Sequence, residues 1–330
     1  MVAGIDVGSK DLHVVVRKGN RAMKVEIFKN THEGFGKLVD YLRQHKVRRV
    51  VLEATGIYHL DLALALDVEP TIEVMVLNPK AAKRYAQARM TRSKTDAIDA
   101  AMLAEYAQHM PFDPWQPPGP TLLALRACAR RLAALTRQRT RSKNQLHALS
   151  NTRTTPRFLL DDVRLSIIQF DNQIVTLQAR TVALIQEDQR LKYAFDQLLS
   201  IKGIGEKSAI QVLGELSTLP EDMRAKQWVA MAGLDPRHHQ SGTSVDKKAR
   251  ISKVGNRYLR TALYMPAMCA ARHVPEIRAY YIHLVEHQGL KKIQALCAVM
   301  RKLLHAIHGM WRSGELFDPS RFYPAYQTEA

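Results

Sequence analysis

The order of apolar patterns in the first eighty residues restricts the N-terminal region to a mixed α/β sheet. Apolar runs and alternation predict strands over 1–6, 12–17, 22–28, 49–53 and 71–77. Spacings typical of helices fall between the last three of these strands, over 30–42 and 56–66. Strands joined by short turns form a meander, whereas strands separated by helices enter a sheet through crossovers. We expect the first three strands to form a meander and the later strands to arrive through helical crossovers.

Four carboxylates lie at sequence positions that such a sheet would bring close together. Asp6 ends the first strand and Glu53 ends the fourth, and sites in open α/β sheets form beyond strand ends where the strand order reverses. Asp96 and Asp99 open a helical pattern and share one helix face. If the first and fourth strands are parallel neighbours, this helix can cross the sheet and join its acids to theirs. Such a cluster suits Mg²⁺, with Mn²⁺ as an alternative.

Each of these acids also has a purely structural interpretation. Asp96 is a candidate N-cap, and Asp99 would complement the dipole of the same helix. Asp6 would begin the turn at Gly8, and Glu53 would cap the helix that follows Thr55. It is the convergence of all four that favours a metal site.

A proline-rich stretch over 109–121 predicts the main boundary of the chain, because closely spaced prolines form a stiff, extended linker. We expect a catalytic domain over 1–110, a linker over 111–120, a helical arm over 121–195 and a helical domain over 196–330.

The expected arm combines a basic helix with a heptad repeat. Residues 121–157 hold nine Lys or Arg and no Asp or Glu, and four of these cations are candidate contacts to nucleic acid: Arg126, Arg130, Arg137 and Arg141. From Leu160 to Leu191 apolar residues alternate at spacings of three and four, which is typical of a coiled coil. Two long helices joined near Pro156 would form an antiparallel hairpin. A solvated face on a dimerisation arm is the alternative to a nucleic-acid contact.

Gly203-Ile204-Gly205 lies between two apolar helical patterns and resembles a helix-hairpin-helix, in which glycines let backbone N–H groups approach a phosphate. Lys202 and Lys207 flank the two glycines and are candidate contacts to that phosphate. A tight corner between two helices is the alternative.

A segment over 234–254 is predicted to be a flexible loop on a body of helices over 256–272, 275–287 and 291–313. Ser241-Gly242 offers an exposed hydroxyl that could meet a phosphodiester, although a serine beside glycine is usually only a turn former. His238 and His239 are candidates for moving a proton or contacting phosphate. The cations of this segment are candidate nucleic-acid contacts: Arg237, Lys247, Lys248, Arg250 and Lys253.

Charge indicates the partner. The net charge is +18 and the isoelectric point is near 9.9, which favours a polyanion, and nucleic acid in particular. No apolar run reaches the ~18–20 residues of a membrane span, and Asp6 interrupts what would be the apolar part of a signal peptide. The three isolated cysteines offer neither a disulfide framework nor a zinc site and fit a cytoplasmic protein: Cys128, Cys269 and Cys297.

Several of these motifs, in this order, resemble the DEDD-type insertion-sequence transposases. The motifs are Gly4-Ile5-Asp6, the turn 52–56, the run 94–100, Ile204-Gly205-Glu206-Lys207, Ala232-Gly233-Leu234 with Pro236-Arg237, Ser241-Gly242, and 263–268. Members of this family are bridge-RNA-guided recombinases with a RuvC-like (RNase H) N-terminal domain and a serine-bearing transposase domain.

The resemblance implies roles for individual residues. Asp6, Glu53, Asp96 and Asp99 would form the metal-binding tetrad, and Ser241 would be the nucleophile. It also implies a homotetramer on donor and target DNA, active sites that combine one protomer's tetrad with another's serine, and a structured guide RNA that pairs with both DNAs. Attack by the serine would give a covalent phosphoserine, and reversal by another strand's hydroxyl would complete strand exchange.

Three other functions were weighed. A metal-dependent nuclease of the Holliday-resolvase type would use the same acids with water as nucleophile, but leaves Ser241 without a role. A sugar kinase of the actin type would require a second strand–turn phosphate motif in the C-terminal half, where only helices are predicted. A non-enzymatic nucleic-acid scaffold explains the charge and leaves the four acids unexplained.

Overall fold

The computed structural model describes residues 1–90, 93, 95–241 and 245–324, and it describes the backbone but not the side chains over 238–249. It divides into two compact units, Met1–Pro117 and Pro118–Ala330, each treated separately below. No helix in these described ranges is long and apolar enough to cross a membrane.

The first unit is built on a mixed sheet. Its strands are β1 Val2–Val7, β2 Asp11–Lys18, β3 Arg21–Ala22, β4 Glu26–Lys29, β5 Arg49–Glu53 and β6 Glu73–Leu77. The spatial order is β3-β2-β1-β5-β6, with β4 also pairing β2. The pairs β1–β2 and β2–β4 are antiparallel, whereas β1–β5 and β5–β6 are parallel. The predicted meander followed by crossovers is confirmed, and the third predicted strand is divided into β3 and β4.

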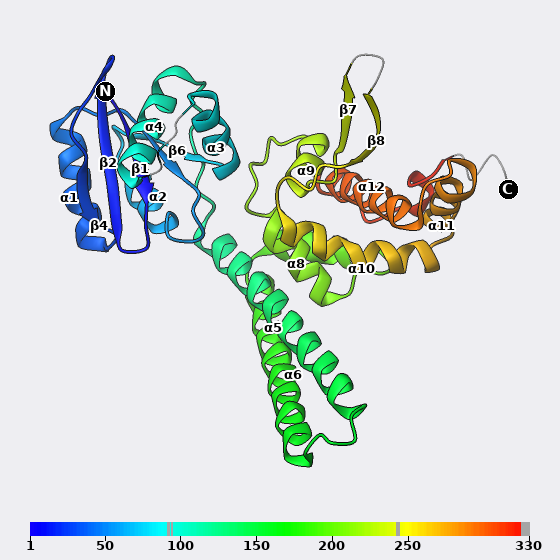
Figure 1. The fold of residues 1–330 in the computed structure, drawn as a ribbon. Helices are drawn as coiled ribbons and strands as arrows, with labels where there is room; N and C mark the ends of the chain where they lie inside the picture. Colours follow the sequence, from blue (N-terminus) through cyan, green and yellow to red (C-terminus); the bar gives the residue numbers. More distant parts are fainter. Residues whose placement is uncertain (91–92, 94, 242–244, 325–330) are drawn as a thin grey trace. The chain divides into compact units, whose positions relative to one another are not determined.

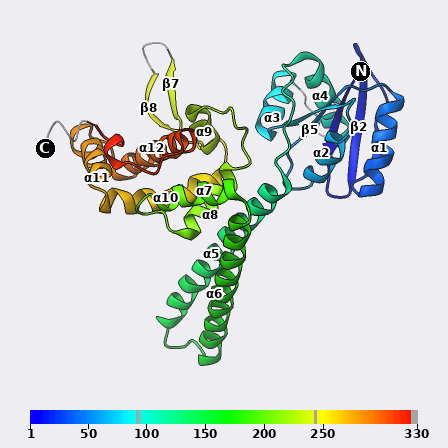
Figure 2. The same ribbon diagram turned by 180° about the vertical axis from the view of Figure 1, so that it is seen from behind.

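Helices cover both faces of this sheet (Figures 1 and 2). On one face, α1 (His32–Gln44) and α2 (Leu60–Asp67) share an apolar core with β1, β2 and β5. On the other face, α3 (Pro79–Ala88) and α4 (Asp96–His109) pack on Val51, Leu77 and Val15. The alternation of side chains along each strand therefore decides which helical layer a residue meets.

The second unit begins with two long helices, α5 (Pro120–Ser150) and α6 (Arg157–Gln186), which pair as an antiparallel hairpin (Figure 1). Val163, Ile174 and Thr181 of the predicted repeat are buried, and the Thr181 hydroxyl donates to the Leu177 carbonyl. Arg139 Nη1 donates to Asp171 Oδ1 at 2.7 Å across the pair. The helix pair is observed, and a regular coiled coil stays a prediction.

The remaining helices form a body with one large apolar core. They are α7 Gln189–Leu199, α8 Glu206–Leu216, α9 Ala225–Ala232, α10 Arg257–His273, α11 Pro275–Ile282 and α12 Lys292–Ser313. Gly233 ends α9 in the left-handed region at φ +66, as a glycine after a helix commonly does. The three predicted C-terminal helices are confirmed, except that the end of the second continues as a π-helical turn over His283–His287.

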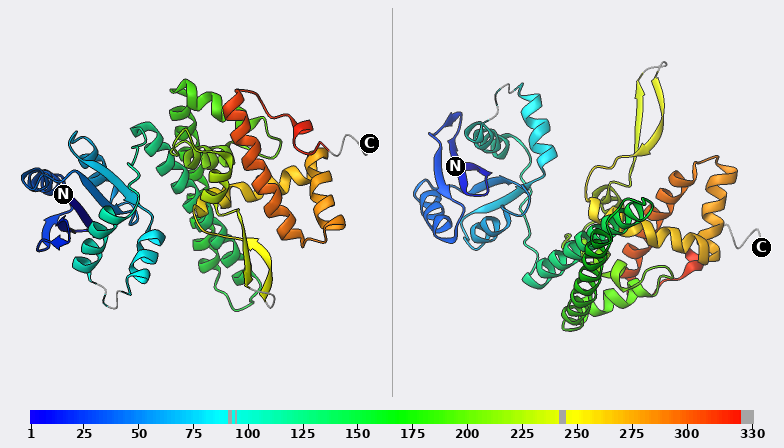
Figure 3. Two further views of the ribbon diagram at one scale, coloured as in Figure 1. Left: turned by 90° about the horizontal axis from the view of Figure 1, so that it is seen from above. Right: turned by 60° about the horizontal axis from the view of Figure 1, so that its bottom comes forward.

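The segment predicted to be a flexible loop was wrongly assigned. It contains two antiparallel strands, β7 (Pro236–Ser241) and β8 (Val245–Ile251), which project from the helical body (Figures 1 and 3). The ladder pairs Pro236 with Ile251 and Ser241 with Val245, and the register shifts between Arg237 and His239. Polar strands lack the apolar alternation on which the sequence prediction relied, and their backbone pairing alone defines them.

Candidate active site

Strand alternation places three polar side chains on the face that α4 covers. In β1, Ala3, Ile5 and Val7 belong to the core with α1 and α2, so Gly4 and Asp6 point the other way. In β5, Glu53 shares the α4 face with Val51, and in β2 His13 shares it with Val15. Asp6 and His13 are direct partners in the β1–β2 ladder.

Gly4 lets α4 lie close to the sheet. A Cβ at this position would stand 2.1 Å from the Ala104 backbone nitrogen and 2.2 Å from the Ala100 carbonyl oxygen. No larger side chain fits at such distances, so the contact of α4 with β1 depends on glycine. This close approach brings the first turn of α4 to the strand that carries Asp6.

Hydrogen bonds at the start of α4 leave both of its acids available. Thr95 is the N-cap, and its hydroxyl accepts from the Ile98 N–H at 3.3 Å. Asp96 is therefore the first helical residue rather than the predicted cap. The cap interpretation of Glu53 is also wrong, because α2 begins at Leu60, seven residues later. Asp6 lies within β1 rather than in the Gly8 turn.

The electrostatics of Asp6 reflect its burial and the charges around it. Burial, and then the charges of Asp96, Asp99 and Glu53, together raise the pKa of Asp6 from 3.8 to about 6, while His13 lowers it. Like charges held together in a partly dry site disfavour one another's ionised forms. The structure brings Asp6 and Asp96 together, and a metal site formed by all four acids stays a prediction.

The donor set fits a divalent cation. One ligand atom each from Asp6, His13 and Asp96 lies within 4.8 Å of the other two. Carboxylate oxygens are ligands that Mg²⁺ and Mn²⁺ take, and a cation would relieve the repulsion between the two aspartates. Glu53 is held by its neighbour, since Thr55 Oγ1 donates to Glu53 Oε1 at 3.4 Å.

Ser241 is the last residue of β7 and belongs to the second unit, whereas the four acids belong to the first. Its side chain lies outside the described part of the structure, as do those of His238, His239, Lys247 and Lys248. Arg237, Arg250 and Lys253 are exposed around the same hairpin.

The structure divides the predicted basic residues of α5 into two groups. Arg130 makes a bidentate pair with Glu215, at 2.7 and 2.9 Å, and Glu215 is only 3% exposed. Arg126 donates to Thr218, and burial lowers the pKa of its guanidinium. Arg137 and Arg141 are exposed. The first two therefore stabilise the fold, and the last two remain open to a polyanion.

The two glycines before α8 differ in their surroundings. A Cβ on Gly203, at φ +111, would stand 3.0 Å from the Ala270 nitrogen of α10, so packing alone requires a glycine there. Gly205 is the N-cap of α8 and has open space around its Cβ position. Lys202 is exposed and Lys207 is half-buried. The helix-hairpin-helix stays a prediction.

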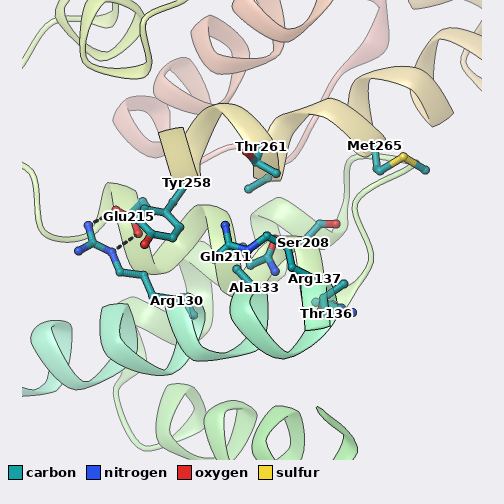
Figure 4. A pocket seen from close by; sticks show the side chains of 13 residues that line it. Arg130, Ala133, Thr136, Arg137, Ser208, Gln211, Glu215, Tyr258, Thr261 and Met265 are labelled. Atoms are coloured by element: carbon teal, nitrogen blue, oxygen red, sulfur yellow. Dashed lines mark hydrogen bonds and ion pairs between the residues drawn. The ribbon is translucent and has the colours of Figure 1, made fainter. Parts of the chain in front are cut away.

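A pocket of about 270 Å³ lies between α5, α8 and α10 (Figure 4). Arg130 and Glu215 lie at one end of it, and Arg137, Lys207 and Tyr258 also line it. The guanidinium groups of Arg130, Arg137 and Arg257 lie 4.8, 5.7 and 5.2 Å from the Tyr258 ring centroid. Hydrogen bonding by Arg257 lowers the pKa of the Tyr258 phenol.

Sequence reasoning missed His13 and Glu215. The tight turn after β1 sets the register in which Asp6 pairs with His13. The predicted hairpin could therefore have shown that His13 lies beside Asp6. Glu215 had no such signal, because its partners Arg130 and Asn256 lie 85 and 41 residues away.

Comparison with known proteins supplies the family. Residues 3–151 match a family model described as a transposase, of the DEDD IS110 type, and residues 196–282 match the transposase IS116/IS110/IS902 family. The pilin gene-inverting protein of Moraxella lacunata is 31% identical over 295 residues, which cover 88% of this chain and 89% of that protein. A probable family 20 transposase of Pseudomonas aeruginosa is 26% identical over 71% of this chain and 74% of its own length.

Among solved structures, Thermus thermophilus RuvC in complex with a Holliday junction substrate covers 34% of this chain and 98% of its own, with 18% identity. Its TM-score of 0.27 is too low to support a functional argument. The two family matches and the length of the Moraxella alignment are sufficient to assign the family without this structure. This chain belongs to the IS110 family of transposases, enzymes that cleave DNA and transfer its strands.

Proposed function

We propose that this transposase recombines DNA through a covalent phosphoserine, with Ser241 as nucleophile and Asp6, Glu53, Asp96 and Asp99 as ligands of a divalent metal, Mg²⁺ or Mn²⁺. The observation that carries the proposal is geometric: one ligand atom each from Asp6, His13 and Asp96 lies within 4.8 Å of the other two. Burial, and then the charges of Asp96, Asp99 and Glu53, raise the pKa of Asp6 in this cluster. A cluster maintained against its own repulsion has a function that needs a cation. The first unit is then a RuvC-like catalytic domain.

The reaction balances without an external energy source. The Ser241 hydroxyl loses its proton, its oxygen bonds to phosphorus, and a DNA hydroxyl leaves. When bound, the metal ion would neutralise the phosphate and lower the energy of charge that develops on the attacking or leaving oxygen. The four carboxylates would hold the ion, and through it they would orient the phosphate. A hydroxyl from another strand then displaces serine, which restores a phosphodiester.

The same chemistry gives different products from different substrates. Exchange between an element junction and a target inserts the element. Exchange between two sites on one DNA molecule inverts the segment between them, the outcome named for the Moraxella relatives. If water rather than Ser241 were the nucleophile, the enzyme would be a nuclease.

DNA and a structured guide RNA are the proposed partners, in the cytoplasm. The net charge of +18 supports a polyanion, and the exposed cations of α5 and of the β7–β8 hairpin offer contact surfaces. That the RNA pairs with donor and target DNA is proposed from the family resemblance.

The oligomer is proposed to assemble through the face of α6 that points away from α5. Phe158, Leu165, Ile168 and Val175 are 56–77% exposed and recur at spacings of seven, three and seven. This is a second heptad seam, with Asn172 at a core position where a polar residue selects register and partner number. A second copy of α6 matches it, and tetramers would form from such dimers. We expect Leu165→Glu to lower the solution mass measured by light scattering, and an unchanged mass would exclude this interface.

The test of the whole proposal is a covalent adduct. Purified protein is mixed with Mg²⁺, RNA transcribed from the flanking locus, and DNA that carries the element junction. We expect a protein–DNA adduct from wild type and from the control Asp67→Asn, which changes an exposed acid at the end of α2. No adduct is expected from Ser241→Ala, from Asp96→Ala, or without the RNA.

Each departure from this result has a separate meaning. Nicked DNA without an adduct, formed by wild type and Ser241→Ala but not by Asp96→Ala, would establish water as the nucleophile. Adduct formation without RNA would remove guidance from the proposal. Adduct formation by Asp96→Ala would remove that residue from the metal site.

A further inference from the structure

His13 is a nitrogen donor in the wall of the acidic cluster. Its side chain is 19% exposed, and its Nδ1 atom is buried without a hydrogen-bond partner among the described residues. The Oδ2 atom of Asp96 stands 3.7 Å from this nitrogen, beyond hydrogen-bond distance. A buried polar atom without a partner costs free energy, so its retention beside carboxylates calls for a function.

The distances suit a shared ion. The chosen ligand atoms of Asp6, His13 and Asp96 lie within 4.8 Å of one another. Two atoms that each bind one ion at ~2.1 Å are at most ~4.2 Å apart, so the group must contract by about half an ångström. The Asp96 side chain is 67% exposed at the start of its helix and is free to make that movement.

We propose that His13 Nδ1 is itself a metal ligand, so that the centre has a mixed nitrogen and oxygen donor set and binds Mn²⁺ in preference to Mg²⁺. The inference rests on the proposed metal centre. Mg²⁺ favours an all-oxygen octahedron with several waters, whereas Mn²⁺ belongs to the first-row transition metals, which bind sites of mixed nitrogen and oxygen ligands. The carboxylates of Asp6 and Asp96 can bind either ion, so the preference for Mn²⁺ comes from the nitrogen of His13 in β2.

Mn²⁺ itself is the probe. In the wild-type protein with Mn²⁺, pulsed electron paramagnetic resonance should show a nitrogen coupling from a bound imidazole. Labelling the protein with ¹⁵N-histidine should convert this coupling to that of ¹⁵N, which identifies the donor as histidine without any mutation. His13→Ala should remove the coupling, and the control His109→Ala, at the exposed end of α4, should retain it.

Affinity gives a second readout. Calorimetric titration should show His13→Ala binding Mn²⁺ about tenfold or more weakly, the scale on which the groups around a metal affect its affinity. Its affinity for Mg²⁺ should change less, so the preference for Mn²⁺ falls.

The possible failures are distinguishable. If wild type binds Mn²⁺ without any nitrogen coupling, His13 is not a ligand, and the proposed metal centre stands on its carboxylates alone. If His13→Ala lowers both affinities equally, the histidine has a general electrostatic role and the inference is overturned. If wild type binds neither ion, the proposed metal centre itself fails.

Discussion

Each unit contains a partly or fully buried carboxylate, and the two carboxylates have opposite charge environments. Glu215 is 3% exposed and accepts three hydrogen bonds, two from Arg130 and one from Asn256 Nδ2 at 2.6 Å. These bonds connect α8 to α5 and to the start of α10. Asp6 is partly buried near three other acids, and burial together with their charges raises its pKa to about 6, although His13 lowers it. An acid that is paired with opposite charge inside the chain has a structural role, whereas an acid placed among like charges favours the binding of a cation.

Removing a charge from the Glu215 site and from the Asp6 site should therefore have different effects. The paired site should lose stability and the like-charged site should lose activity. The four predictions below test this contrast, from the largest effect to the smallest.

Asp6→Asn should reduce strand cleavage by about 10³-fold or more, equivalent to about 4 kcal/mol in the activation barrier, because a ligand of the ion is lost. The measurement is the single-turnover cleavage rate at saturating Mg²⁺, with thermal unfolding in parallel. A parallel loss of folded protein would mean that Asp6 is structural, like Glu215.

Arg130→Ala should lower the free energy of unfolding by about 3 kcal/mol, because Glu215 remains buried without its partner. Urea denaturation measures the change. Arg141→Ala is the matched control, on the same helix and exposed, and should change stability by less than about 0.5 kcal/mol. Equal effects of the two substitutions would contradict the division of the basic residues.

Gly4→Ala should cost about 1–3 kcal/mol, because its Cβ would overlap the backbone of α4 at Ala100 and Ala104. The displaced helix should also weaken Mn²⁺ binding, which calorimetry can follow. Gly36→Ala in α1 is the control, since nothing lies within 4 Å of its Cβ position. Unchanged metal affinity would show that α4 need not be close to β1.

Through Asp6, the metal-free protein should lose about 1 kcal/mol of stability as the pH rises from about 4 to about 6, after allowance for solvent screening. The folded pKa of Asp6 lies above its ordinary value of 3.8, so over this interval the folded state retains a proton that the unfolded state has released. Urea unfolding in EDTA measures this loss as the difference between wild type and Asp6→Asn, because carboxylates with a lowered pKa, such as Asp11 and Glu33, contribute equally to both. A difference of opposite sign would mean that Asp6 has a cationic partner.

Apolar pattern and chain order were enough to predict the sheet, its crossovers and the two pairs of acids. The strand and helix patterns are local, since their periods depend on neighbouring residues. A parallel β1–β5 pair then brings Asp6 and Glu53 to the same end of the two strands. Asp6 and Asp96 meet as expected, because few topologies satisfy such a pattern. The β7–β8 hairpin was missed because its polar residues have no apolar alternation.

Only the tertiary structure decided which charged residues are free. Arg130 and Arg141 are equivalent as letters in a basic helix, but one faces buried Glu215 and the other is exposed to solvent. Likewise, His13 acquires its place beside Asp6 and Asp96 from strand register and from the close approach that Gly4 allows. Charge compensation depends on distances between residues far apart in the chain. The sequence by itself therefore determined which charged residues are present, but only the tertiary structure determined which residue each of them pairs with.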